Sequence, residues 1–125
     1  LRVLCELSYE LIISSDAIYN EFNGLLTEQF VLQELTNIKK IKTIYYWSNE
    51  YTSEVDFVFA YKKYIIPVEA KAVINVKSQS LRVFINEYHT QIALRYSLLN
   101  LKLDNDILNI PLYCIWNTER YLNIL

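Results

Sequence analysis

The residues best suited to chemistry are two carboxylates and a lysine near the middle of the chain. Asp56 lies in a run of alternating apolar residues, and Glu69 and Lys71 follow it, separated from each other by Ala70. Two carboxylates and an ammonium group at the ends of neighbouring strands can hold a divalent metal beside a phosphodiester and activate a water molecule. These residues therefore predict a nuclease-type site.

A third carboxylate, Glu28, falls within the apolar stripe of a predicted upstream helix. Leu25 stands three positions before it and Leu32 four positions after it. An unpaired carboxylate in a protein core costs several kcal/mol, so we expect Glu28 to supply one more oxygen to the site of Asp56. The alternative is that Glu28 lies at the rim of the stripe and reaches water, as most glutamates do.

Basic and hydroxyl side chains that follow the acids are predicted to contact phosphate. Lys77, Ser78 and Arg82 come soon after the lysine, and Arg95 comes later. Other interpretations stay open for three of these positions. Ser78 and Ser80 could simply begin a helix, and Arg95 could pair with an acid or, as is more common at a strand edge, reach solvent.

The other chemistry-bearing residues are less specific. Only one histidine, His89, is present, which nearly excludes a Ser-His-Asp triad or a histidine-rich zinc site. Several tyrosines could stack on nucleic-acid bases, although aromatic residues at alternating strand positions are more often core or interface. These tyrosines are Tyr45, Tyr46, Tyr61, Tyr64, Tyr88, Tyr96 and Tyr113.

The elements that would position these residues are predicted from hydrophobic periodicity. Residues 1–20 indicate a short helix and a loop, and residues 24–38 a helix with one apolar stripe. From residue 43 the chain becomes aromatic and β-branched, which favours strands. We expect three strands in an antiparallel meander, at residues 43–48, 54–61 and 64–73.

Alternation along these strands predicts which side chains share a face. Asp56 is expected on the same face of the second strand as Val58. Glu69 and Lys71 are expected together on one face of the third strand, with the small Ala70 on the opposite, core-facing side.

The rest of the chain predicts a helix, a strand and further short elements. Ser80 is expected to cap a helix that runs through Tyr88, and residues 92–99 indicate a fourth strand. Residues 110–116 contain a proline and therefore predict an edge strand. Asn117 should cap a last short helix that ends near Leu125. This order predicts an α+β fold, α/β/α-like, with a mixed central sheet.

Length and composition favour one compact domain. Of the 125 residues, 53% are apolar, which is enough for one substantial core, and a single glycine leaves little material for linkers. We expect one domain over residues 1–125, with a helical extension at 1–22, a core at 23–116 and a terminal helix at 117–125. The absence of Met is interpreted as the mark of a piece of a longer protein.

Composition also bears on location and partners. Cys5 and Cys114 both stand in apolar contexts, which favours buried thiols in a reducing cytoplasm. No run approaches the roughly 18 apolar residues of a membrane span, and Glu6 and Glu10 interrupt the amino end, so neither a membrane partner nor a signal peptide is expected. A net charge of -2 does not by itself indicate nucleic-acid binding. Contacts with phosphate can, however, be confined to one face of the protein.

The pattern resembles the PD-(D/E)xK, or restriction-endonuclease-like, nuclease superfamily. The core of that superfamily is a helix, a three-stranded meander, a helix and a further strand. The resemblance implies that Glu28 is the helix acid, that Asp56 and Glu69 are the metal carboxylates, and that Lys71 is the motif lysine. Val55 stands where the superfamily has proline, a departure that many members share.

A second resemblance covers almost the whole chain. The chain is similar to the nuclease-like domain that ends many bacterial and archaeal ATPases of the AAA class. The matching residues are Gly24, Glu28, Val31, Tyr45-Tyr46-Trp47, Glu54-Val55-Asp56-Phe57, Pro67-Val68-Glu69-Ala70-Lys71, Lys77-Ser78-Gln79-Ser80-Leu81, Arg95, Ser97 and Pro111-Leu112-Tyr113. The resemblance implies an upstream ATPase domain in the same polypeptide. ATP would bind only there, because a chain with one glycine has no Gly-rich phosphate loop.

In an active site of this kind, Asp56 and Glu69 would bind Mg²⁺ or Mn²⁺ with help from the Ala70 carbonyl, because hard cations prefer oxygen ligands. Glu28 would bind a second ion or orient a metal-bound water. Lys71 would lower the pKa of that water and stabilise charge on the phosphoryl group. The predicted reaction is hydrolysis of DNA or RNA.

The alternative is a catalytically inactive module of the same fold that binds nucleic acid or a protein partner. In that case Lys71 would bridge Glu69 and Asp56 as a structural ion-pair cluster. The sequence leaves both functions open, together with the oligomeric state.

Overall fold

The computed structural model describes residues 20–50, 53–74 and 77–124, with side chains described from Gly24 onward. The helix and loop predicted for the first residues, and Cys5, therefore lie outside the described part. The elements are α2 (Asn20–Thr36), β1 (Ile44–Ser48), β2 (Glu54–Tyr61), β3 (Tyr64–Ala70), α3 (Gln79–Tyr88), β4 (Ala93–Ser97), β5 (Lys102–Asp104), β6 (Ile107–Pro111), the 3-10 helix η2 (Leu112–Asn117) and α4 (Thr118–Leu122).

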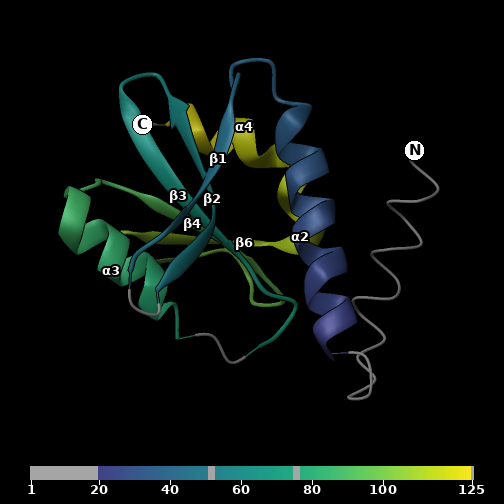
Figure 1. The fold of residues 1–125 in the computed structure, drawn as a ribbon. Coiled ribbons are helices and arrows are strands. Elements are labelled where there is room, and N and C mark those ends of the chain that lie inside the picture. Colours follow the sequence, from purple (N-terminus) through teal and green to yellow (C-terminus); the bar gives the residue numbers. More distant parts are fainter. Residues whose placement is uncertain (1–19, 51–52, 75–76, 125) are drawn as a thin grey trace.

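The strands form one six-stranded mixed sheet in the order β1-β2-β3-β4-β6-β5. β1, β2 and β3 form the predicted antiparallel meander. β3, β4 and β6 run parallel, and β5 returns antiparallel to β6. α3 provides the crossover that a parallel β3–β4 pair requires. The predicted α+β fold with a mixed sheet is confirmed (Figure 1).

Helices cover both faces of this sheet, as Figure 1 shows for α2 and α3. α2, η2 and α4 contribute to the larger core, where Leu35 and Leu122 cluster with Phe59. α3 covers the other face, where Leu81 packs with Val55. Each helix thus removes apolar surface from water against its own side of the sheet. No helix in the described part of the chain is long and apolar enough to cross a membrane.

The buried face of α2 differs from the predicted stripe. Thr27, Val31 and Leu35 are fully buried at intervals of four residues, whereas Leu25 is 56% exposed. The assignment of Leu25 to the buried stripe is wrong, because the helix turns a small threonine toward the sheet instead. Glu28 follows that threonine and is half-buried at the rim.

The last strand also differs from the prediction. β6 lies inside the sheet between β4 and β5, so the predicted edge strand over residues 110–116 is wrong, and η2 occupies most of that range. Pro111 is tolerated because it stands at the final position of β6, where a missing N–H does not interrupt the strand. The edge on this side is β5. α4 follows Asn117 as predicted and ends at Leu122, with no side-chain cap.

An irregularity in β2 decides where Asp56 points. Trp47 of β1 pairs with Val55, and Tyr45 pairs with Val58. The pairing therefore advances three residues along β2 but only two along β1, which is a β-bulge. A bulge interrupts the alternation of side chains between the two faces of the sheet and changes the direction in which a side chain points. Val58 packs on the α3 side of the sheet, whereas Asp56 faces α2. The prediction that Asp56 and Val58 share a face is wrong for this reason.

Candidate functional site

A pocket of about 380 Å³ between α2 and the β1–β2 hairpin contains three carboxylates. Glu28 comes from α2, Glu54 from the first position of β2, and Asp56 from the bulge. Tyr45 and Tyr46 of β1 complete much of its wall. We call this the acidic pocket. It brings together two of the predicted site residues and adds Glu54, which the sequence analysis did not select although it stands two positions before Asp56.

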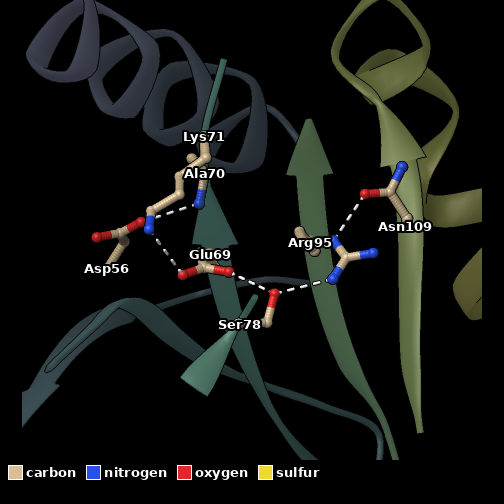
Figure 2. A network of polar contacts seen from close by, with 7 residues as sticks. All are labelled: Asp56, Glu69, Ala70, Lys71, Ser78, Arg95 and Asn109. Carbon is tan, nitrogen blue, oxygen red and sulfur yellow. Dashed lines mark hydrogen bonds and ion pairs between the residues drawn. The ribbon is translucent and has the colours of Figure 1, made fainter. Parts of the chain in front are cut away.

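Asp56 is tied to the end of β3 by a hydrogen bond. The regular β2–β3 ladder ends before this point, and the Ala70 main-chain N–H donates to Asp56 Oδ2 at 2.8 Å. The carboxylate thus accepts the hydrogen bond that a main-chain carbonyl of a neighbouring strand would otherwise accept. Because Ala70 lies between Glu69 and Lys71, this bond places Asp56 beside the acid and lysine of the predicted motif (Figure 2).

Burial and like charge raise the pKa of Asp56 from 3.8 to about 7. Desolvation is the largest cause, and the hydrogen bond from Ala70 opposes it. The negative charges of Glu28, Glu69 and Glu54 raise the pKa further. A cation near this carboxylate would favour its ionised form, because opposite charge lowers a carboxyl pKa.

The pKa of Glu28 is also raised, first by burial and then by repulsion from Glu54, while a hydrogen bond with Asp56 opposes the shift. Two carboxylates in such contact titrate as a pair rather than separately. Glu28 and Asp56 can therefore retain a shared proton at higher pH than isolated carboxylates would.

Glu69 lies at the end of β3 and is 8% exposed. Its Oε1 is 3.8 Å from the ammonium of Lys71, whose side chain is largely exposed, and its Oε2 accepts a hydrogen bond from Ser78 at 2.7 Å. Neither Glu69 nor Lys71 lines the acidic pocket. Among the ion pairs of the described residues, none joins Lys71 to Asp56. The ion pair predicted for the inactive alternative is therefore formed with Glu69 alone.

Ser78 and Arg95 are buried behind Glu69, at 2% and 4% exposure (Figure 2). The Ser78 hydroxyl donates to Glu69 and accepts from Arg95 Nη1 at 2.9 Å. Arg95 Nε donates to Asn109 Oδ1 at 2.8 Å. Burial lowers the pKa of Arg95, and the negative charge of Glu69 opposes that change. A buried carboxylate and a buried guanidinium need such partners, so the serine hydroxyl connects the two charges.

Asn109 is fully buried and fixes the far end of this network. Its Oδ1 also accepts from the Ser97 hydroxyl at 2.6 Å. Its amide nitrogen donates to the main-chain carbonyls of Leu99 and Asn100, at 3.1 and 3.0 Å. The amide group thus uses all four of its hydrogen-bonding positions. The sequence analysis did not select Asn109. The one feature that could have indicated its role is that it is a polar residue within an otherwise apolar strand.

Ser78 precedes α3 in a left-handed backbone conformation, with φ 54° and ψ 41°, and makes no side-chain cap hydrogen bond. The predicted cap at Ser80 is wrong, because α3 already begins at Gln79. A non-glycine residue in this conformation is energetically unfavourable and frequently marks a functional position. The hydroxyl of Ser78 serves the Glu69 network instead of the helix end.

The structure divides the residues that were predicted to contact phosphate. Ser78 and Arg95 are too buried for such contact, and the prediction is wrong for both, because β4 is a central strand and turns its arginine toward the Glu69 network. Lys77 and Arg82 are exposed and stay available. Arg82 Nη2 lies 4.0 Å from Asp104 Oδ2.

Few groups in the described part of the chain are placed to bind a metal ion. Within the described ranges, no group of three or more Asp, Glu, His or Cys side chains is placed to hold an ion. The carboxylates of Asp56 and Glu69 and the carbonyl of Ala70 are the oxygen donors at the end of β3. Mg²⁺ commonly keeps several waters and uses only one or two carboxylates. This set therefore fits a hydrated Mg²⁺ or Mn²⁺ better than an ion enclosed by protein.

Comparison with known proteins places the chain in a family. Neither the curated proteins nor the solved structures contain a match. A family model described as Domain of unknown function (DUF4143) matches residues 23–115. This range includes the acidic pocket and the whole Glu69 network. It covers most of the 125 residues, and the chain belongs to the DUF4143 family.

Proposed function

We propose that this domain hydrolyses phosphodiester bonds in DNA or RNA, with Mg²⁺ or Mn²⁺ bound at the end of β3. The observation that supports this most strongly is the 2.8 Å hydrogen bond between the Ala70 N–H and Asp56. It holds one carboxylate beside a second carboxylate and a lysine, which are the groups that such chemistry needs. The order of helix, meander, helix and parallel strand also supports the proposal.

Each residue has a separate task in this proposal. Asp56 and Glu69 would bind the metal, which when bound supplies charge neutralisation and a water of low pKa. Lys71, with its ammonium 3.8 Å from Glu69, would stabilise negative charge that develops on the phosphoryl oxygens. Glu28, hydrogen-bonded to Asp56, would accept the proton of the attacking water as general base. Ser78 and Arg95 would hold Glu69 in position.

We also propose that the domain acts beside an AAA-class ATPase domain in the same polypeptide. The resemblance over almost the whole chain supports this, as does membership of the DUF4143 family. The single glycine, Gly24, lies within α2, so ATP would bind in the other domain. Cleavage would then be coupled to the ATPase by attachment rather than by a shared active site.

A catalytically inactive module that binds nucleic acid or a protein partner is the second candidate. Two observations favour it: Glu69 already has partners for both of its oxygens, and the described residues contain no group of three metal-ligating side chains. In this case the ion pair and the network behind it would only stabilise the fold.

Cleavage of plasmid and single-stranded substrates with Mn²⁺ tests the enzyme directly. We expect Asp56→Asn and Lys71→Ala each to lower the rate by about 100-fold or more, because each removes charge from the reacting centre. Lys62→Ala is a matched control, since Lys62 is an exposed lysine at the β2–β3 turn. Cleavage that persists unchanged in both site variants would come from another source and would refute the assignment.

Calorimetric titration with Mn²⁺ separates the two candidates. The enzyme should bind the ion with wild-type residues and lose that binding in Asp56→Asn and in Glu69→Gln. An inactive module should show no heat that depends on these two residues. Mn²⁺ binding that survives both substitutions would place the ion elsewhere on the protein.

A further inference from the structure

We propose that a groove beside the acidic pocket binds the unpaired bases of single-stranded nucleic acid. This inference rests on the proposed function, because it names the substrate class of the same site. The groove has a volume of about 360 Å³ and runs between the edge strand β1 and α3. Its walls include the rings of Tyr45, Tyr46, Trp47 and Tyr88. We call it the aromatic groove.

The rings of the aromatic groove are unusually accessible. Tyr45 is 65% exposed, Tyr46 is 81% exposed and Tyr88 is 51% exposed. By contrast, Tyr61 and Tyr96, which belong to the larger core, are fully buried. Aromatic rings that gather on a surface, rather than appearing singly, mark a binding site. The structure thereby separates the tyrosines that build the fold from those that are free to stack on a base.

Trp47 and Tyr88, on one wall of the groove, are held by contacts with each other and with Phe84. Trp47 Nε1 donates a hydrogen bond to the Tyr88 hydroxyl at 3.1 Å. The Trp47 ring meets Phe84 edge to face with centroids 5.2 Å apart, and meets Tyr88 in the same manner at 6.1 Å. Rings held in this way lose little conformational entropy on binding. The groove is therefore preorganised to receive a flat, apolar face.

The groove shares lining residues with a pocket on either side of it. Tyr45 and Tyr46 line the acidic pocket as well as the groove, so a strand stacked on these rings would pass its backbone close to Asp56. On the other side, Tyr88 also borders a depression that contains Lys63 and His89. A basic side chain on this side can contact a phosphate. The three depressions are thus neighbours that share lining residues, with carboxylates on one side of the aromatic groove and a lysine on the other.

The chemistry of these depressions favours single strands over duplexes. Bases in a duplex are stacked on both faces, whereas an unpaired base can stack on a tyrosine. Duplex binding without stacking requires many phosphate contacts on a basic surface. A chain with fourteen acids and twelve bases has no such excess of positive charge. Stacking, with few charge contacts, is the mode of binding that these residues can supply.

Fluorescence of Trp47 provides a direct test. The protein has two tryptophans, so a Trp116→Phe background leaves Trp47 as the only reporter, and Trp116 is 73% exposed and tolerant of change. Oligothymidylate and oligouridylate of about 12 nucleotides are titrated in EDTA, with a duplex of the same length in parallel. Asp56→Asn protein, which carries less charge in the acidic pocket, is titrated in the same way.

We expect both single strands to quench Trp47, and the duplex to bind at least about tenfold more weakly. Tyr46→Ala should weaken single-strand binding about tenfold, which is the loss of one stacked base. Tyr113→Ala is the control, because Tyr113 is 56% exposed but lies outside the groove. A difference between the two single strands would identify DNA or RNA as the preferred source of the bases, and would support the proposal.

Three results would overturn the inference. The first is no response of Trp47 emission to single strands in either the Trp116→Phe protein or its Asp56→Asn variant. The second is duplex binding as tight as single-strand binding. The third is unchanged binding in Tyr46→Ala together with the loss of a concentration-dependent dimer seen by sedimentation. The last result would assign the groove to a second copy of this chain. Because EDTA excludes cleavage, binding without any nuclease activity would refute only the proposed function, and activity without binding in the groove would refute only this inference.

Discussion

At the scale of single residues, Asp56 occupies an unfavourable position for a carboxylate. It is placed by a bulge against Glu28, is desolvated, and has three negative neighbours. A residue chosen for stability alone would not be an acid here. Groups with strongly shifted pKa values cluster at functional sites, and sites of this kind commonly reduce the stability of the protein that contains them.

The first prediction concerns the stability of Asp56→Asn. The pKa of Asp56 is about 7 in the folded protein and near 3.8 without the fold, so the folded state holds the proton more tightly. The free energy of unfolding should therefore fall as pH rises from about 4 to 7 and level off above that. Asn keeps an acceptor for the Ala70 N–H but cannot ionise. We expect it to stabilise the protein by up to about 4 kcal/mol at pH 8 and by little at pH 4.

Urea denaturation of both proteins across this pH range measures the difference. Asp106→Asn is the control, because Asp106 is exposed in the turn before β6 and should not alter the pH dependence. A variant that is less stable than wild type at pH 8 would show that Asp56 is held by favourable contacts rather than strained by its neighbours.

At the scale of elements, the Glu69 network joins four segments that are distant along the chain. Glu69 is the second-last residue of β3, Ser78 precedes α3, Arg95 lies on β4, and Asn109 lies on β6. Parallel pairing sets Glu69 opposite Arg95, and Arg95 opposite Asn109. The polar residues therefore form a row across the sheet, and the hydroxyl at the start of α3 closes the gap between the acid and the guanidinium.

The second prediction compares two serines near the start of α3. Ser78→Ala removes the hydroxyl that connects Glu69 to Arg95, so that Glu69 Oε2 and Arg95 Nη1 each lose their hydrogen bond in a buried setting, which should cost about 2 to 3 kcal/mol. Ser80→Ala should change stability by less than about 0.5 kcal/mol, because Ser80 does not cap the helix. Chemical denaturation of the pair measures both values. A larger loss at Ser80 than at Ser78 would restore the sequence-based cap and remove the structural role of the network.

At the scale of the whole molecule, charge and shape act together. The protein has a net charge of -2 and fourteen acidic residues, and three of these acids line the acidic pocket beside the aromatic groove. Long-range attraction of a polyanion is therefore weak. Binding has to come from short-range contacts on the β1 side of the sheet.

The third prediction is a weak salt dependence of single-strand binding. Each phosphate contact contributes a slope of about -0.7 to the plot of log Kobs against log salt for single strands. Lys63 is the one lysine or arginine among the residues that line the acidic pocket, the aromatic groove and the depression with His89, so the slope should be no steeper than about -2. Titration between about 50 and 200 mM salt measures it. A slope steeper than about -4 would indicate an extensive phosphate interface and would contradict binding that is dominated by stacking.

The order of the elements from α2 to β4, and the residues of the acid motif, could be predicted from the sequence. Local periodicity was sufficient for α2, for the meander and for β4, because alternation and helical spacing are properties of neighbouring residues. The spacing of Asp56, Glu69 and Lys71 was likewise readable without coordinates. Its functional meaning stays a prediction.

The partners and the burial of these side chains became known from the tertiary structure alone. The bulge that turns Asp56 toward α2 depends on pairing with β1, and a local pattern does not contain that partner. The burial of Ser78 and Arg95, and the role of Asn109, depend on which strands become central in the sheet. The same basic residue contacts solvent on an edge strand but needs buried partners in the middle of a sheet. Strand order is set by contacts between distant parts of the chain, and for that reason the sequence could propose candidate residues but not their arrangement.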